Sequence, residues 1–354
     1  MFGRRRAARR AQIGACYARG RMIARGAAVV VLVVGCAGTY GRKPVEPAAP
    51  GGKPGIVAAA LPYEVLDRGG HAIEQAAFWS KLAASSAVCV GEEHPNPHHH
   101  WMQLEVVKHL AAAKGFAVGM EMVQRPFQGV LDDFAAKKID DATFTSRAGW
   151  ADRWGYPYEL YSPILHVAIE AHASLLALNA AKELTKKVSH HGLDALTPEE
   201  RAQIPELDLH VAAHRAWFDA LMEDMGGGAA HAHHPAPKDA EAKDGAEAPA
   251  MPAMPSIDQI YTVQVIWDET MADTGAKWLA SHAGGHLVIL AGNGHCHDSA
   301  IVGRLKRRGV GDAVSLRVVV DDGEGSVAEV LAKPMNDFVV VLKMPPGTKP
   351  AKKD

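Results

Sequence analysis

The stretch Ser86-Ala-Val-Cys-Val-Gly-Glu-Glu-His94 contains the signals that decide the fold class. Its apolar half is a short run bounded by a glycine, which is typical of a buried strand. Its polar half follows directly, and Asn96 and Pro97 then supply a helix N-cap and a first-turn proline. A strand, a polar turn and a helix in this order begin a βα unit, so we expect an α/β protein.

The same alternation continues along the chain. Short apolar runs predict further strands at residues 116–122, 174–179, 286–291, 313–320 and 337–342. Amphipathic stretches between them predict helices, the main ones at residues 128–137, 158–172, 209–225, 257–283 and 299–308. We therefore expect a mainly parallel central sheet that is flanked by helices and carries helical insertions.

The charge distribution separates a leader from the rest of the chain. The 354 residues carry 38 Lys and Arg against 40 Asp and Glu, a net charge of −2. Residues 1–35 contain eight of the arginines and no acid, so the remaining 319 residues carry 30 − 40 = −10. An acidic body argues against a nucleic-acid-binding protein, which would show a basic excess. A hydrophobic content of 48% is enough for a sizeable core.

Residues 1–35 have the organisation of a signal peptide. A basic segment precedes the apolar run 27–34, whose eight residues are too few to span a bilayer, which takes about 20. The run ends Val33-Val34-Gly35-Cys36, which resembles a lipobox. We therefore expect Cys36 to be lipidated and to attach the protein to the cell envelope, at the periplasmic face of the outer membrane. A plain secretory signal cut near Ala37 is the alternative, and Met22 is an alternative start.

Composition divides the rest of the chain. Residues 36–60 are rich in Gly, Pro and Ala and are expected to be a flexible tether. Residues 61–344 are expected to form a single domain, interrupted at 226–256 by a disordered loop with too little apolar content to pack. Residues 345–354 are expected to be a tail.

Polar side chains gather where three predicted strands end. Glu92 and His94 follow the first strand, Glu121 lies at the end of the second, and His295 follows the strand 286–291. The carboxyl ends of parallel strands share one edge of the sheet, so these side chains should converge there. His and carboxylate side chains are ligands for a divalent metal, and a metal-bound water with a spare Glu as base would make the site hydrolytic. The alternative is a set of turn glycines beside surface polar residues.

Six motifs give the chain a resemblance to a known family. They are Val90-Gly-Glu-Glu-His-Pro-Asn-Pro97, Gly119-Met-Glu-Met-Val-Gln-Arg-Pro-Phe-Gln128, Trp154-Gly-Tyr-Pro-Tyr-Glu-Leu-Tyr161, Leu176-Ala-Leu-Asn-Ala180, Gln264-Val-Ile-Trp-Asp-Glu-Thr-Met271 and Leu290-Ala-Gly-Asn-Gly-His295. In order and spacing they resemble the ChaN family of iron-regulated, haem-binding uptake lipoproteins, within the Tiki/TraB/erythromycin-esterase-like superfamily.

The resemblance extends over about residues 60–320 and implies an α/β sandwich, a lipid anchor and haem or iron acquisition. In hydrolytic members of the superfamily, the positions that match Glu92, His94, Glu121 and His295 form the catalytic or metal site. The function we expect is therefore a lipid-anchored envelope protein that binds haem or iron for uptake. The alternative is a metal-dependent hydrolase that uses His94 and His295 with a Glu to activate water.

Haem needs an apolar slot and usually a His, Tyr or Met ligand to its iron. The third motif offers aromatic surface and three phenols, Tyr156, Tyr158 and Tyr161, although half-buried packing is the alternative for each. Arg125 is a candidate to pair with a propionate or to orient Glu121, with a structural ion pair as the alternative. A homodimer that hides two haems between its protomers is compatible with these features.

The remaining histidines and cysteines support weaker predictions. We expect the run 98–100, three histidines, to be a solvated helix start, with a metal site as the alternative. We expect Cys89 to be a small buried side chain and Cys296 to be a soft ligand or an incidental neighbour of His295. A disulfide between the two cysteines is the alternative that an oxidising periplasm would permit.

Overall fold

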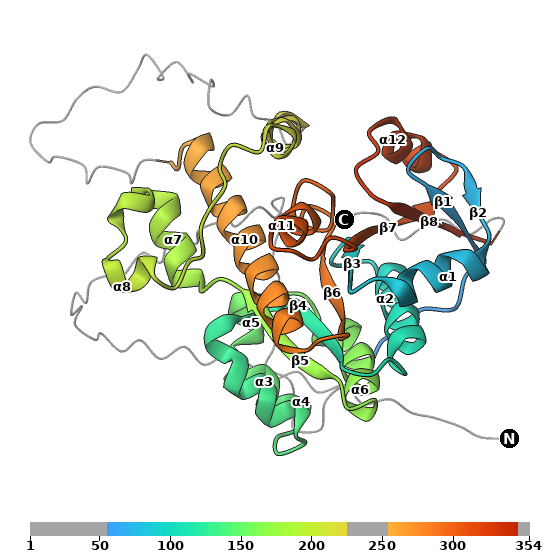
Figure 1. Cartoon of the computed structure of the whole chain (residues 1–354), viewed down its shortest axis with the longest axis horizontal. Coiled ribbons are helices and arrows are strands. Elements are labelled where there is room, and N and C mark those ends of the chain that lie inside the picture. Colours follow the sequence, from blue (N-terminus) through green and yellow to red (C-terminus); the bar gives the residue numbers. More distant parts are fainter. Residues whose placement is uncertain (1–54, 225–253, 346–354) are drawn as a thin grey trace, which may run out of the picture. The chain divides into compact units, whose positions relative to one another are not determined.

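The computed structural model describes residues 55–224 and 254–345, and its centre is an eight-stranded sheet (Figure 1). The strands are β1 (Tyr63–Asp67), β2 (Ala72–Ile73), β3 (Ala87–Glu92), β4 (Phe116–Gln124), β5 (Ser174–Asn179), β6 (His286–Gly292), β7 (Val314–Asp321) and β8 (Phe338–Lys343). Their order across the sheet is β2-β1-β8-β7-β3-β6-β4-β5. Neighbours from β8 to β5 run parallel, and β1 runs antiparallel to β2 and β8. The expected α/β fold with a mainly parallel sheet is confirmed.

Strand β3 shows why such residues form a central strand. Val88 and Val90 pack into the core on one face of the sheet, whereas Ala87 and Cys89 pack into the core on the other. All six residues of the strand are buried. A strand covered on both faces requires a continuous apolar run rather than an alternating one, which is the pattern in the sequence.

Helices cover both faces of this sheet (Figure 1). The larger core lies under α1 (Gln75–Ala84), α2 (Pro97–Leu110), α3 (Gln128–Ala135), α4 (Asp141–Arg147), α5 (Trp150–Arg153) and α6 (Ser162–Glu170), with the short turns η1 (Arg125–Phe127) and η2 (Tyr158–Leu160). The opposite core lies under α10 (Ile257–Ser281) and α11 (Ile301–Arg307). Against α10 pack α7 (Lys182–His191) and α9 (Ala212–Asp224), which are joined through η3 (Leu193–Ala195) and α8 (Pro198–Arg201). Helix α12 (Ser326–Ala332) covers β1, β7 and β8.

Most predicted elements are present near their predicted bounds. Helix α2 begins where the sequence indicates, and the Asn96 side chain accepts a hydrogen bond from the His98 amide at 3.1 Å. The structure adds elements that the sequence patterns did not predict: β1, β2, α1, α4, α5 and α12. All except α1 have seven residues or fewer, too few for a periodic pattern to stand out, and the alanines of α1 blur its apolar stripe.

Several expectations concern residues outside the described ranges. These are the signal peptide, the lipidation site Cys36, most of the tether, the loop up to residue 253 and the tail after residue 345. Residues 55–62 are described and form neither helix nor strand. Among the described helices, none combines the length and apolar character that a membrane span requires.

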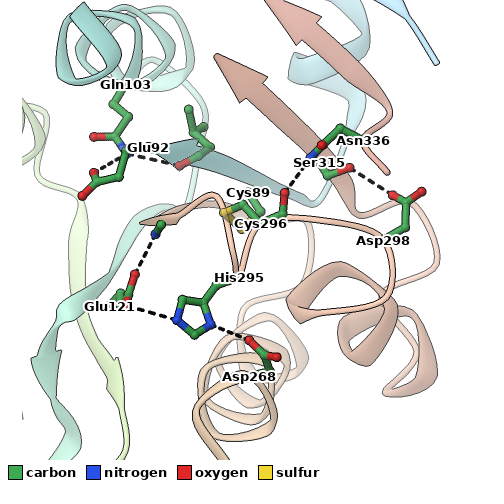
Figure 2. The surroundings of a disulfide bond; sticks show 12 residues. Cys89, Glu92, Gln103, Glu121, Asp268, His295, Cys296, Asp298, Ser315 and Asn336 are labelled. Carbon is green, nitrogen blue, oxygen red and sulfur yellow. Dashed lines mark hydrogen bonds and ion pairs between the residues drawn. A yellow bond between two sulfur atoms is a disulfide. The ribbon is translucent and has the colours of Figure 1, made fainter. Parts of the chain in front are cut away.

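The two core cysteines are paired. Cys89 in β3 and Cys296 after β6 form a disulfide with their Cα atoms 5.3 Å apart, so the prediction of unpaired side chains is wrong (Figure 2). Strands β3 and β6 are neighbours, and the chain turns back tightly after β6, with the Cys296 amide donating to the Gly292 carbonyl at 3.2 Å. This turn returns Cys296 to the side of β3, which a linear pattern does not reveal.

Candidate functional site

The predicted site residues do converge at the carboxyl edge of the sheet. Glu92 is the last residue of β3, Glu121 lies in β4, and His295 lies in the turn after β6, the strand between those two (Figure 2). Their side chains are buried, and His94 is about a quarter exposed. These four residues thus lie together at the shared edge where parallel strands end.

Glu92 is held by three hydrogen-bond donors. Its Oε1 atom lies 2.6 Å from the hydroxyl of Tyr161 and 2.8 Å from Nδ1 of His94, and its Oε2 atom accepts from Gln103 at 2.8 Å. Burial alone would raise the pKa of Glu92. The nearby His100 and His94 charges and the donors outweigh burial and lower this pKa to about 2. Glu92 is therefore a fixed buried carboxylate.

The histidines at the start of α2 help to hold Glu92 and its neighbours in place. The Gln103 amide nitrogen donates to Glu92 and to the Val90 carbonyl, so its oxygen faces Nδ1 of His100 at 3.1 Å. The Nε2 atom of His100 lies 2.9 Å from the His94 carbonyl. His100 thus presents both ring nitrogens to acceptors, and His99 accepts from the Glu93 amide at 2.8 Å. His99 and His100 are buried, so the expected solvated helix start is wrong for these two, because α2 rests its first turn on β3.

A second buried group centres on His295. Its Nδ1 atom lies 2.6 Å from Asp268 and its Nε2 atom lies 3.3 Å from Glu121, which also accepts from the Gly292 amide at 2.7 Å (Figure 2). Burial would lower the pKa of His295, but the charges of Glu121 and Asp268 raise it to about 10. The same contacts hold the pKa values of both carboxyls below their usual range, against the effect of burial. At neutral pH the group is an imidazolium between two carboxylates.

Helix α10 supplies residues that the sequence analysis missed. Asp268 pairs with His295 and also lies 3.0 Å from Nε2 of the buried His214. Gln264, one helical turn before Asp268, lies 3.1 Å from Nδ1 of His295. Both side chains are buried, and both residues belong to the motif that runs from Gln264 to Met271. Their spacing of four residues, which puts two polar side chains on one helix face, was the signal that could have found them.

His94 belongs to an aromatic group at the margin of the site. Its ring centroid lies 4.6 Å from that of Trp154 and 4.7 Å from that of Tyr156. The ring edge passes close to Gly292, where a Cβ atom would lie 2.8 Å from Cε1 of His94. Burial would lower the pKa of His94, but the Glu92 hydrogen bond and the Glu121 charge raise it. His94 thus joins the buried carboxylates to a half-buried aromatic surface.

The three phenols are in different environments. The Tyr161 hydroxyl is buried and donates to Glu92, and the Tyr158 hydroxyl donates to Asp141 at 2.5 Å. Burial, together with these carboxylates, raises the pKa of both phenols. Tyr156 is half-buried beside His94, and its backbone carbonyl accepts from the Trp150 indole at 2.8 Å.

Arg125 lies at the end of β4, against α10. Its guanidinium lies 3.8 Å from Asp273 and 3.5 Å from the Gln203 carbonyl. Glu121 is instead oriented by Gly292 and His295. Two roles were predicted for Arg125. One of them, the orientation of Glu121, is performed by Gly292 and His295 instead.

The geometry does not favour the metal-dependent hydrolase. Within residues 55–224 and 254–345, no group of three or more His, Cys, Asp or Glu side chains is arranged to hold a metal ion. The four predicted ligands instead form two hydrogen-bonded acid–histidine pairs, Glu92 with His94 and Glu121 with His295. The carboxylate oxygens of Glu92 and Glu121 face donors within the protein.

Comparisons with known proteins agree with this architecture. The family described as "Haem-binding uptake, Tiki superfamily, ChaN" matches residues 78–305, more than half of the chain. A solved structure titled "Cofacial heme binding to ChaN of Campylobacter jejuni" is 15% identical, covers 80% of this chain and 97% of its own, and superposes with a TM-score of 0.56. An erythromycin esterase mutant in its open conformation is 11% identical over 82% of this chain and 84% of its own, with a TM-score of 0.40. No curated protein sequence matches. The chain therefore belongs to the ChaN haem-binding uptake family of the Tiki superfamily.

Proposed function

We propose that this protein binds haem for uptake at the half-buried aromatic surface formed by His94, Trp154 and Tyr156. The observation that carries the proposal is the packing of these three rings at the carboxyl edge of the sheet, with centroids 4.6 to 5.5 Å apart. Aromatic walls beside polar groups suit a large planar ligand. Membership of the ChaN family supports haem as that ligand.

Tyr156 is the iron ligand in this proposal. The phenol that binds iron must lie where the haem can reach it, and the Tyr161 side chain is fully buried. Tyr156 is the phenol whose ring lies against His94. Its half-buried position suits a ligand that must be both taken up and released.

Haem titration of wild-type protein and two single variants tests this assignment. We expect wild-type protein and Tyr158→Phe to develop the same shifted Soret band, and Tyr156→Phe to lose the band or to bind at least about tenfold more weakly. Tyr158→Phe is the matched control because it removes a hydroxyl from the same segment. Equal binding by Tyr156→Phe would exclude this ligand, and no Soret shift in wild-type protein would exclude haem binding itself.

We propose further that the protein is lipid-anchored in the cell envelope, at the periplasmic face of the outer membrane. The lipobox-like sequence ending at Cys36 supports the anchor. The Cys89–Cys296 disulfide supports an oxidising compartment, where such bonds persist. Growth with a clickable fatty acid should label the wild-type protein and leave Cys36→Ala unlabelled, and equal labelling would contradict the anchor.

Haem binding on a half-buried surface leaves one face of the porphyrin to be covered. We propose that a second copy of the chain covers it, as a haem-linked homodimer. Sedimentation of wild-type protein should show a dimer that forms with haem and is absent in Tyr156→Phe. A monomer at saturating haem would exclude the dimer while leaving haem binding intact.

A further inference from the structure

A cavity of about 340 Å³ lies beside the residues described above. Its lining is mostly small and apolar and contains one cationic side chain, that of Arg125. The other lining residues are Pro126, Ala180, Ala181, Leu184 and Gln203. Residues 125 and 180 directly follow β4 and β5, so the cavity opens at the same carboxyl edge as the site. Ligands of open α/β sheets bind along this edge.

The cavity adjoins the His295 group. Arg125 is the first residue after β4, four residues after Glu121, and its guanidinium lies 3.8 Å from Asp273 on α10. Asp273 lies five residues after Asp268 on the same helix, which is about 7.5 Å along the helix axis. The cavity and the His295 group therefore lie along the same helix, at the same edge of the sheet.

The positive charge of Arg125 is not fully compensated. Asp273 Oδ2 lies 2.9 Å from the ammonium of Lys277, whereas the guanidinium of Arg125 is 3.8 Å away. Two cations therefore share one carboxylate oxygen, and the closer one is lysine. About a third of the Arg125 side chain remains exposed. The local surplus is positive, and it attracts an anion.

The first turn of α7 adds to this surplus. Ala181, which lines the cavity, is the N-cap of this ten-residue helix and has no side-chain cap hydrogen bond. The positive end of the helix dipole therefore points at the cavity. The carboxylate of Glu183 in the first turn is bound by Arg153 at 2.7 Å.

We propose that Arg125 and this cavity bind a carboxylate on an apolar arm, namely one propionate of the haem, a proposal that rests on the haem function above. An arginine in an apolar recess selects such a group, because guanidinium–carboxylate hydrogen bonds are strong where water is partly excluded. Arg125 then fixes the orientation of the porphyrin, while Tyr156 binds its iron.

Titrations of the full-length protein with haem and with haem dimethyl ester test the proposal, because the ester lacks both carboxylates. We expect wild-type protein to bind haem about tenfold more tightly than the ester. Arg125→Gln should weaken haem binding by a similar factor and leave ester binding unchanged, so that the preference disappears. Iron-free protoporphyrin should show the same preference for free carboxylates, because the contact does not involve the metal.

Arg147→Gln is the matched control, because Arg147 is a half-exposed arginine that pairs with Asp133 away from the cavity. It should keep the wild-type preference. Equal affinity of wild-type protein for haem and its ester, or equal weakening of both by Arg125→Gln, would overturn the propionate site and leave haem binding standing. Failure of wild-type protein to bind any of the three porphyrins would overturn both proposals.

Discussion

His295 and Asp268 form a buried ion pair, with Nδ1 of the imidazole 2.6 Å from Oδ1 of the carboxylate. Neither side chain is more than slightly exposed. The opposite nitrogen of the ring faces Glu121, so two negative charges stabilise one positive charge. Separating these charges would leave buried groups without partners, which costs far more than an exposed ion pair contributes.

This pair predicts how stability depends on pH. The pKa of His295 is about 10 in the folded protein and 6.5 in the unfolded chain. The stabilisation is therefore fully present below about pH 6.5 and is lost as the pH rises towards 10. The unfolding free energy from urea titrations should fall across that window. In an NMR titration, the imidazole of His295 should remain protonated well above pH 7.

The variant Asp268→Asn tests this dependence of stability on pH directly. It removes one of the two charges, so the pKa of His295 should fall and the decline in stability, which begins near pH 6.5, should end at lower pH than in wild-type protein. We expect it to destabilise the protein by about 3–5 kcal/mol, because a buried partner is lost. An unchanged imidazole titration in Asp268→Asn would show that Asp268 does not hold the proton on His295.

The disulfide should contribute strongly to stability. It closes a loop with a sequence separation of 207 residues and joins β3 to the turn that carries His295. Replacing both cysteines by alanine should lower the unfolding free energy by about 2–5 kcal/mol. Urea unfolding with and without a reductant checks this, because the reductant should destabilise wild-type protein and leave the double variant unchanged. If the reductant did not change the urea unfolding of wild-type protein, the disulfide would not be formed in it.

Glycine 292 should be required for the position of His94. A Cβ atom there would lie 2.8 Å from Cε1 of the His94 ring, closer than real Cβ atoms approach. Gly292→Ala should therefore displace the ring, weaken haem binding severalfold and destabilise the protein by about 1–3 kcal/mol. Gly129→Ala is the control, because a Cβ atom at this helical position meets nothing within 4 Å. Normal haem binding by Gly292→Ala would show that the His94 ring need not stay in place.

The sequence could predict what depends on one segment at a time. The strands carrying Glu92 and Glu121 are apolar runs buried on both faces, so their ends could be located, and parallel topology then placed the two residues together. The partners Asp268 and Gln264 could not be found in this way. They sit in a long helix where polar residues usually face water, and their burial follows only once α10 packs on β6. The Cys89–Cys296 disulfide stayed an alternative for the same reason, because the position of Cys296 depends on how the chain turns after β6.

Strand β5 forms an edge of the sheet, and Gln128 protects it. The amide of Gln128 donates to the Leu175 carbonyl at 2.8 Å and accepts from the Ala177 amide at 2.7 Å, as a neighbouring strand would. Gln128→Ala should leave these backbone groups unpaired, lower the unfolding free energy by about 1–3 kcal/mol and promote association through the exposed edge. Urea unfolding and light scattering at increasing protein concentration would measure both effects. Gln75→Ala, which removes one exposed side-chain bond to the Tyr63 carbonyl, should change neither by a comparable amount. If both variants behaved alike, the edge of β5 would have to be protected by its packing between α3 and α10 rather than by the amide.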